Sequence, residues 1–199
     1  MIPAALILII TVVAFRLIPG IPAEWQNFSP MAAIFLCSAT YLPKRLALTV
    51  PLITFLITDA ILNSRNGLPP ITPFTAVLAL AFGLTFALGW SLRTNPKALR
   101  VFSATIAASL AFYLITNTAA WLGSPAYTKN VAGWWQALTT GTPGFPPTLL
   151  FLRNTLLGDL TFTALFVACT AWLPRPSLKT QNRLTTHDPD PTTAPSSHS

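Results

Sequence analysis

The chain has 199 residues, of which 52% are hydrophobic and only 9% are charged. Because a soluble domain carries about 25% charged residues, this composition argues against a soluble domain and predicts a polytopic membrane protein. The net charge is +7 at pH 7, but the basic residues are scattered at segment ends and in the tail. Without a basic stripe, this charge favours membrane topology over nucleic-acid binding.

Apolar segments in chain order predict an all-α fold, a bundle of six transmembrane helices over residues 1–173. The second and third are short for a hydrocarbon core of about 30 Å. We expect the second to begin in a structured loop or to reach only part of the way. Pro51 predicts a kink or a late start in the third. The predicted spans are Ile2–Leu17, Pro30–Leu42, Leu46–Leu62, Pro73–Leu92, Pro96–Leu122 and Leu149–Leu173.

Three of these segments start with a capping residue followed by proline, as helix N-termini often do. They are Ser29-Pro30, Thr72-Pro73 and Asn95-Pro96. We therefore expect each of these polar side chains to cap the helix that follows.

The long connection between the fifth and sixth spans carries an apolar repeat at i, i+3, i+4 and i+7. This repeat predicts a short interfacial helix that presents one apolar face. Its members are Val131, Trp134, Trp135 and Leu138.

Residues 174–199 are rich in Pro, Thr and Ser, which predicts a disordered cytoplasmic tail. Lys and Arg at the span ends, in the loops and in the tail predict orientation, because the cytoplasmic side carries more of them. Eight lie on the side of the tail and four on the opposite side, so we expect a multi-pass protein of the cell inner (plasma) membrane with both termini cytoplasmic. The eight are Lys44, Arg45, Arg93, Lys97, Arg100, Arg175, Lys179 and Arg183; the four are Arg16, Arg65, Lys129 and Arg153.

Asp59 and Asp159 are the only acidic side chains inside the apolar segments. A carboxylate in hydrocarbon costs several kcal/mol unless it is paired, hydrated or protonated, so such residues usually face the bundle interior or a polar cavity. The predicted topology puts both near the outer side of the membrane.

Other polar and aromatic side chains lie at the same predicted ends, so the sequence predicts an outward-open ligand pocket. The alternative is that Arg153, Arg65 or helix-terminus amides satisfy the two aspartates, which then only fix helix register. The candidate ligand-binding residues are Asp159, Arg153, Asn154, Asp59, Asn117, Trp121, Asn63 and Asn27.

Motifs for catalysis are missing from the sequence. There is no phosphate-binding loop, no Gly-x-Ser-x-Gly elbow, no zinc-binding helix and no haem attachment motif. We therefore expect neither enzymatic activity nor a cofactor, no metal site and no nucleic-acid partner.

Several stretches resemble a bacterial family of six-span membrane proteins that is catalogued only as a domain of unknown function. The resemblance covers about residues 1–173, and its most specific part is Arg153-Asn154-Thr155-Leu156-Leu157-Gly158-Asp159. The other matching stretches are Asn27-Phe28-Ser29-Pro30-Met31-Ala32-Ala33, Tyr41-Leu42-Pro43-Lys44-Arg45, Asp59, and Asn117 to Trp121.

More distantly, the size, the predicted spans and the outer pocket are similar to the substrate-binding S component of energy-coupling-factor (ECF) vitamin transporters. That resemblance implies binding of a vitamin or related micronutrient, and partnership with a transmembrane T component and two ATPases. It also implies a row of small residues on the first span for docking, which this sequence lacks.

We therefore expect a membrane-embedded small-molecule binding component of an uptake system. Two alternatives remain open: a non-transporting membrane scaffold or assembly protein, and a self-contained proton-coupled transporter. The scaffold would use small-residue rows, which either pack inside the monomer or form a docking face. The row in the fourth span is Ala79, Gly83 and Ala87.

Overall fold

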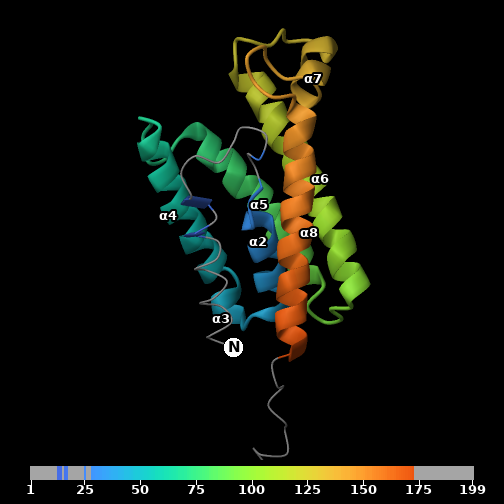
Figure 1. Ribbon diagram of the computed structural model, residues 1–199. Helices are drawn as coiled ribbons and strands as arrows, with labels where there is room; N and C mark the ends of the chain where they lie inside the picture. The colour runs from blue at the N-terminus through green and yellow to red at the C-terminus, as the bar shows by residue number, and fades with distance from the viewer. Residues whose placement is uncertain (1–12, 15, 18–24, 26–27, 173–199) are drawn as a thin grey trace, which may run out of the picture.

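Figure 1 shows the computed structural model of the chain, which describes residues 13–14, 16–17, 25 and 28–172. Every regular element in this part of the chain is a helix, so the prediction of an all-α fold is confirmed there. Most of the predicted first span, Asn27 and the predicted tail lie outside the described residues. The helices are α2 (Met31–Tyr41), α3 (Lys44–Ala47), α4 (Thr49–Arg65), α5 (Pro73–Ser91), α6 (Ala98–Gly123), α7 (Val131–Leu138) and α8 (Thr148–Trp172).

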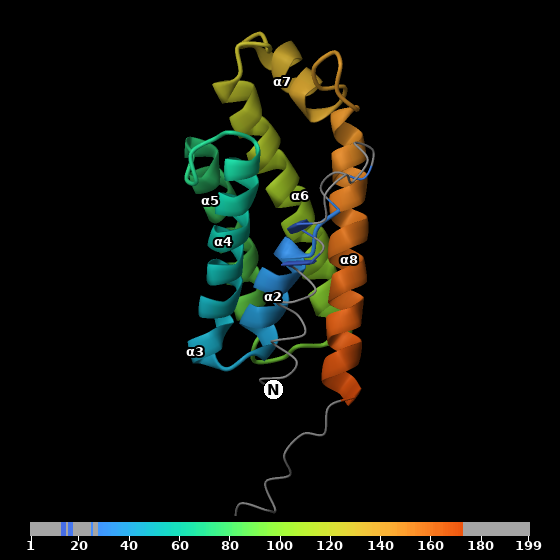
Figure 2. The same ribbon diagram turned by 60° about the vertical axis from the view of Figure 1, so that its left-hand side comes forward.

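Within the described residues, four helical stretches are long and apolar enough to cross a membrane. These helices surround α2, and α7 lies across one end of the bundle (Figures 1 and 2). This arrangement is compatible with a multi-pass membrane protein, with four candidate spans in the described part of the chain. The stretches are Lys44–Arg65, Pro73–Ser91, Ala98–Gly123 and Thr148–Thr170.

Helix α2 lies in the centre of the bundle and contacts α4, α5, α6 and α8. It has 11 residues, which make it about 16 Å long, roughly half the thickness of a bilayer core. All residues from Met31 to Thr40 are buried. The prediction that the second apolar segment reaches only part of the way is confirmed.

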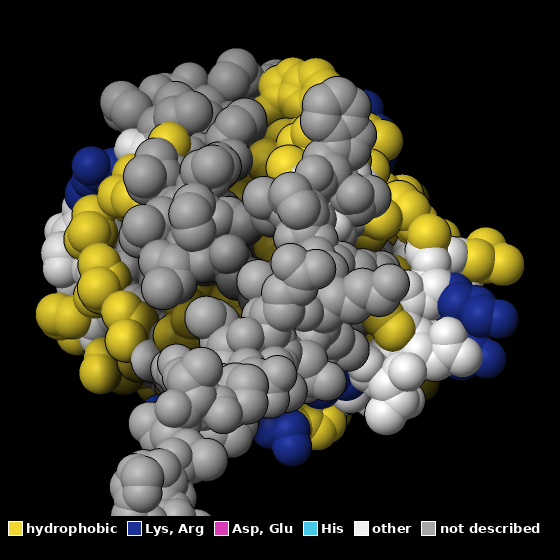
Figure 3. Space-filling model, turned by 90° about the horizontal axis from the view of Figure 1, so that it is seen from below, with side chains coloured by type: hydrophobic (Ala, Val, Ile, Leu, Met, Phe, Trp, Pro, Cys, Tyr) yellow, Lys and Arg dark blue, Asp and Glu magenta, His cyan; other side chains and the backbone are white. Residues whose placement is uncertain are grey.

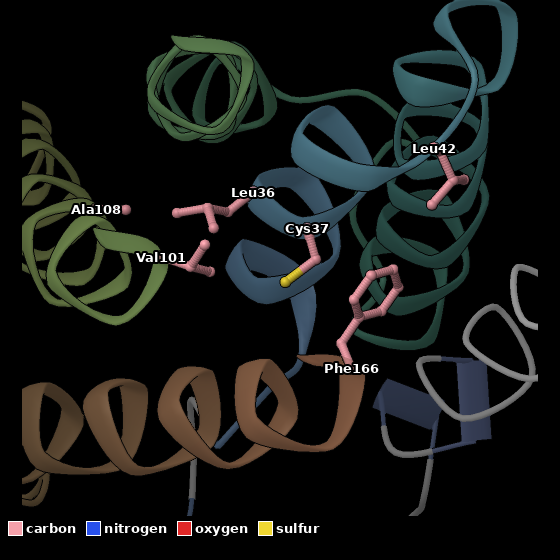
Figure 4. Close-up of a cluster of buried hydrophobic side chains, with 6 residues drawn as sticks. All are labelled: Leu36, Cys37, Leu42, Val101, Ala108 and Phe166. Atoms are coloured by element: carbon pink, nitrogen blue, oxygen red, sulfur yellow. The ribbon is translucent and has the colours of Figure 1, made fainter. Parts of the chain in front are cut away.

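Two groups of side chains hold α2 in place. On one side, Leu36 and Cys37 of α2 meet Val101 of α6 and Phe166 of α8 (Figure 4). On the other side, the ring of Phe35 stacks on an α5 ring, Phe82, with 5.0 Å between centroids. Apolar packing on all sides explains why this helix shows no polar face.

The third predicted span is longer than the sequence indicated, because the apolar helical stretch runs from Lys44 to Arg65. It is interrupted at Leu48, where α3 ends and α4 begins. The interruption follows from Pro51, which lies in the first turn of α4 and has no N–H to donate to the carbonyl of Ala47. The irregularity expected at Pro51 is confirmed as this interruption, while the predicted short span is wrong, because the stretch begins at Lys44 and not at Leu46.

The predictions of capping residues at three helix starts are confirmed in part. At α5, the Thr72 side chain accepts a hydrogen bond from the N–H of Thr75, and Pro73 follows as the first helical residue. At α2, Pro30 is the N-cap residue and no side chain caps the helix; Ser29 Oγ makes only a long contact, 3.4 Å, with the N–H of Met31. At α6 the prediction for Asn95 is wrong: its carbonyl accepts from the N–H of Lys97 in a tight turn, and the helix begins at Ala98 without a side-chain cap.

Helix α7 occupies the predicted residues, but its four apolar side chains do not share one environment. Leu138 is buried against the bundle, whereas Val131 and Trp135 are exposed. Close packing of Gly133 and Ala137 turns the helix, so that its inner face is made of small residues and Leu138.

Candidate functional site

Asp59 lies at the centre of the first polar group inside the bundle, the Asp59 cluster of Arg16, Asp59, Asn63 and Thr75. Arg16 Nη2 forms an ion pair with Asp59 Oδ1 at 3.2 Å, and the two side chains are only 12% and 7% exposed. The other carboxylate oxygen accepts from Thr75 Oγ1 at 2.8 Å and from Asn63 Nδ2 at 3.2 Å. The carboxylate is therefore neutralised by one cation and held by two hydrogen bonds.

The local sequence explains how these partners meet. Asn63 follows Asp59 by four residues, which puts both on one face of α4. Asn63 Nδ2 also donates to the carbonyl of Pro70, which holds the α4–α5 connection over the helix end. Thr75 lies in the first turn of α5, where its hydroxyl also accepts from the N–H of Thr72.

The cation that pairs with Asp59 is neither Arg65 nor Arg153, the two that the sequence analysis considered. Arg65 donates instead to the carbonyl of Leu17 at 3.0 Å. Arg16, which the orientation count placed among loop cations, supplies the positive charge.

Asp159 anchors a second polar group, the Asp159 cluster of Asp159, Ser109, Thr105 and Thr163. Asp159 is 1% exposed, and its Oδ2 accepts from Ser109 Oγ at 2.7 Å. Thr105 lies one turn before Ser109 on α6, and Thr163 lies one turn after Asp159 on α8. Their Oγ1 atoms are 3.2 Å apart. Together these side chains make a polar seam between two otherwise apolar helices.

The backbone N–H of Ala33 also donates to Asp159. Ala33 lies in the first turn of α2, where N–H groups have no partner inside the helix and the helix dipole favours a negative charge. Asp159 therefore caps the buried start of α2 from a different helix. Gly158 permits this approach, since a Cβ there would lie 3.1 Å from the backbone N of Ser29.

The opposite end of α2 is held by a cation. Arg93 Nη1 donates to the carbonyl of Ala39 at 2.7 Å, and Nη2 donates to the carbonyl of Leu42. The guanidinium also lies 4.7 Å from the ring centroid of Trp90. A carboxylate at the N-terminus and a guanidinium at the C-terminus both complement the dipole of α2.

Arg153 and Asn154 form a third polar group at the upper part of α8. Arg153 donates from Nε and Nη2 to Asn154 Oδ1, at 3.2 and 3.1 Å. Its guanidinium lies 5.8 Å from the ring centroid of Trp25. Asn154 is fully buried, so this pair links the interior of the bundle to its surface.

Asn117 and Trp121 make local bonds near the α6–α7 connection. Asn117 Nδ2 donates to the carbonyl of Tyr113 one turn earlier, at 2.8 Å. Trp121 Nε1 donates to the carbonyl of Thr128 at 2.8 Å. These bonds hold the chain beneath α7.

The predicted ligand-binding residues therefore fall into separate groups. Asp59 lies with Asn63, Arg153 lies with Asn154, and Asp159 has its own cluster. Among the described residues, the two aspartates share no hydrogen-bonding partner.

Sequence reasoning missed the side chains that satisfy the aspartates, chiefly Arg16, Thr75 and Ser109. A signal for Ser109 was present, because Thr105 and Ser109 lie one turn apart in an apolar segment and define a polar stripe. Arg16 ends the first apolar run, close enough to the membrane boundary for a charge to reach inward.

An open hollow of about 450 Å³ lies against the C-terminal part of α4 and the loop that follows it. None of the predicted ligand-binding residues that the structure describes lines it. Within the described residues, no three His, Cys, Asp or Glu side chains gather where they could hold a metal ion. The residues lining the hollow are Ala60, Ile61, Ser64, Arg65 and Pro70.

In a comparison with known proteins, residues 1–182 match the model of a family of unknown function (DUF6580). No curated protein and no solved structure matches the chain. Because the match covers most of the 199 residues, the chain belongs to the family of unknown function DUF6580.

Proposed function

We propose that the protein is a membrane-embedded binding component for a small molecule in an uptake system, similar in role to the S component of ECF transporters. The observation that carries the proposal is the buried Asp159 at the N-terminus of the half-length helix α2. Intramembrane ionisable residues are rare and expensive, and they commonly mark substrate or ion pathways.

The Asp159 cluster offers the chemistry that a polar ligand needs. The carboxylate accepts hydrogen bonds, the Ser109 hydroxyl donates or accepts, and the first-turn N–H groups of α2 donate. A ligand with hydroxyl or amide groups can exchange its bonds for those between Asp159, Ser109 and Ala33 with little net loss. Ligand entry would then separate α8 from the start of α2.

The experiment is mass spectrometry of small molecules released from the purified protein after growth in rich medium. We expect a stoichiometric compound with the wild type and its loss in Asp159→Asn, which keeps the shape of the side chain but removes its charge. Thr85→Val is the matched control, because this buried hydroxyl on α5 bonds only to its own helix at Ala81. Equal ligand content in wild type and Asp159→Asn would remove Asp159 from the proposal.

The proposed partners are a transmembrane T component and two ATPases, since the sequence has no ATP-binding motif of its own. A protein that transports alone is separated from this role by reconstitution. Ligand-dependent proton movement in liposomes that contain only this chain would instead identify a proton-coupled transporter.

A scaffold role is the second candidate, and one observation favours it. Ala79, Gly83 and Ala87 lie along one face of α5 and are all exposed. Small residues at this spacing let membrane helices approach closely. If this role is correct, Gly83→Leu will change the size of the complex solubilised from native membranes, whereas Asp159→Asn will leave it unchanged.

A further inference from the structure

The described lining of the hollow on α4 combines apolar and polar side chains. Ala60, Ile61 and Pro70 contribute apolar surface, while Ser64 and Arg65 add a hydroxyl and a guanidinium. This division matches an amphipathic ligand with an anionic group at one end. The hollow lies apart from the Asp159 cluster, so what binds there is independent of the proposed function.

The position of the hollow relative to the membrane follows from the length of the helical stretch that contains α4. Lys44–Arg65 has 22 residues, which span about 33 Å and so match a hydrocarbon core of about 30 Å. The two ends, with Lys44 and Arg65, therefore lie at opposite membrane boundaries. The hollow lies at one boundary, where lipid headgroups meet acyl chains.

The loop after α4 supports this placement. Leu68 and Ile71 lie on either side of Pro69-Pro70, and they are 51% and 72% exposed. Large apolar side chains exposed in a loop are stable where they contact lipid rather than water. The α4–α5 loop therefore lies in the membrane interface beside the hollow.

An apolar track leads from the hollow along α4 toward the membrane centre. Ile61, Ile57 and Ile53 follow one another at four-residue intervals, so they share one face of the helix. Ile57 and Ile53 are 55% and 52% exposed. The track is about 12 Å long at 1.5 Å per residue, enough to contact much of one acyl chain.

Arg65 has the charge and the free donors that a phosphate requires. Its Nη1 donates to the carbonyl of Leu17, and a guanidinium has five N–H donors in total. Among the described residues, Arg65 forms no ion pair. The C-terminal end of α4 is a favourable position for a cation, because the helix dipole is negative there. At the membrane boundary, this position puts Arg65 at the level of the lipid phosphates.

We propose that this hollow is a binding site for an anionic glycerophospholipid. The phosphate contacts Arg65 and Ser64, and one acyl chain lies along Ile61, Ile57 and Ile53.

The test is native mass spectrometry of delipidated protein in detergent, titrated with dioleoyl phosphatidylglycerol. We expect Arg65→Gln to weaken binding of the first lipid about tenfold, the effect of losing one or two charge-assisted hydrogen bonds. Ala60→Trp should weaken it similarly by filling the hollow. Arg100→Gln is the matched control, because Arg100 is an exposed cation at the opposite end of the bundle.

Photocrosslinking provides a second readout that needs no substitution. A phosphatidylglycerol with a photoreactive acyl chain should label peptides containing residues 53–65 in the wild-type protein. Equal affinity of Arg65→Gln and wild type, or labelling spread evenly over all helices, would overturn the proposal. Displacement of the lipid by glycerol 3-phosphate or inorganic phosphate alone would instead identify a soluble anion as the ligand and would also overturn it.

Discussion

The ion pair between Arg16 and Asp59 lies inside an apolar bundle, where removing one partner leaves the other charge uncompensated. We expect Asp59→Asn to lower the free energy of unfolding by about 3–5 kcal/mol, and Arg16→Gln to have a similar effect. The double variant should lose much less than the sum, because neither charge then remains buried. Unfolding in mixed micelles by SDS titration measures all three.

Arg100→Gln serves as the control for this cycle. Arg100 is an exposed cation on α6 and forms no ion pair with Asp59. Its substitution should leave stability almost unchanged, and additive losses in the double variant would contradict a direct pairing of Arg16 with Asp59.

Only some of the residues around the two aspartates could be predicted from the sequence. Sequence reasoning identified both aspartates as residues that need partners, and it named Asn63 among the candidate ligand-binding residues at the same predicted end. It did not find Arg16 or Ser109, because those partners come from other helices. Spacing along one segment predicts neighbours on that segment, whereas a partner across the bundle depends on helix packing that the sequence does not display.

Among the elements, α2 depends on both of its ends, because a short helix buried in the bundle cannot satisfy its terminal groups with water. Arg93→Gln removes the two charge-assisted bonds to Ala39 and Leu42. We expect a loss of about 2 kcal/mol in the free energy of unfolding. Arg100→Gln should change it by less than about 0.5 kcal/mol, since that side chain is on the surface. Equal losses in both variants would mean that Arg93 does not stabilise α2.

Contact between α5 and α2 depends on one glycine. A Cβ at Gly89 would lie 2.3 Å from the carbonyl oxygen of Leu36, and the Thr40 hydroxyl donates to the Gly89 carbonyl at 3.0 Å. Gly89→Ala should therefore force the helices apart and destabilise the fold by about 2–3 kcal/mol. Gly83→Ala is the matched control, because nothing lies within 4 Å of its added methyl group.

Thermal unfolding in detergent distinguishes these two variants. Gly83→Ala should keep the midpoint of the wild type or raise it slightly, since alanine favours helix more than glycine does. A lowered midpoint for Gly83→Ala together with an unchanged one for Gly89→Ala would reverse the assigned packing of α5.

The lesson for elements is similar to that for residues. Apolar segment length and the Thr72-Pro73 signal predicted α5 closely, and the apolar repeat predicted α7. The same repeat did not predict that Val131 and Trp135 are exposed, because the direction in which α7 packs depends on Gly133 and Ala137. The small-residue row of α5 faces outward, and Gly89, which lies outside that row, makes the close approach.

At the scale of the whole molecule, the described connections alternate between two ends of the bundle. The α4–α5 and α6–α8 connections lie at the end of α7, and the α5–α6 connection lies at the other (Figure 1). Lys and Arg groups are visible around the edge of that other end (Figure 3). Its exposed cations are Lys44, Arg45, Lys97 and Arg100.

The eight-to-four excess of Lys and Arg counted in the sequence predicts that this end faces the cytoplasm. A cysteine at Ala126, between α6 and α7, should react with a membrane-impermeant maleimide in cells whose outer barrier has been opened. A cysteine at Thr94, between α5 and α6, should react only after the inner membrane is also permeabilised. The background is Cys169→Ser, because Cys169 is exposed while Cys37 is buried. Labelling of Thr94→Cys before Ala126→Cys would show that the topology is the reverse of the predicted one. The hollow on α4 would then lie in the cytoplasmic leaflet, where anionic lipids would remain available to Arg65.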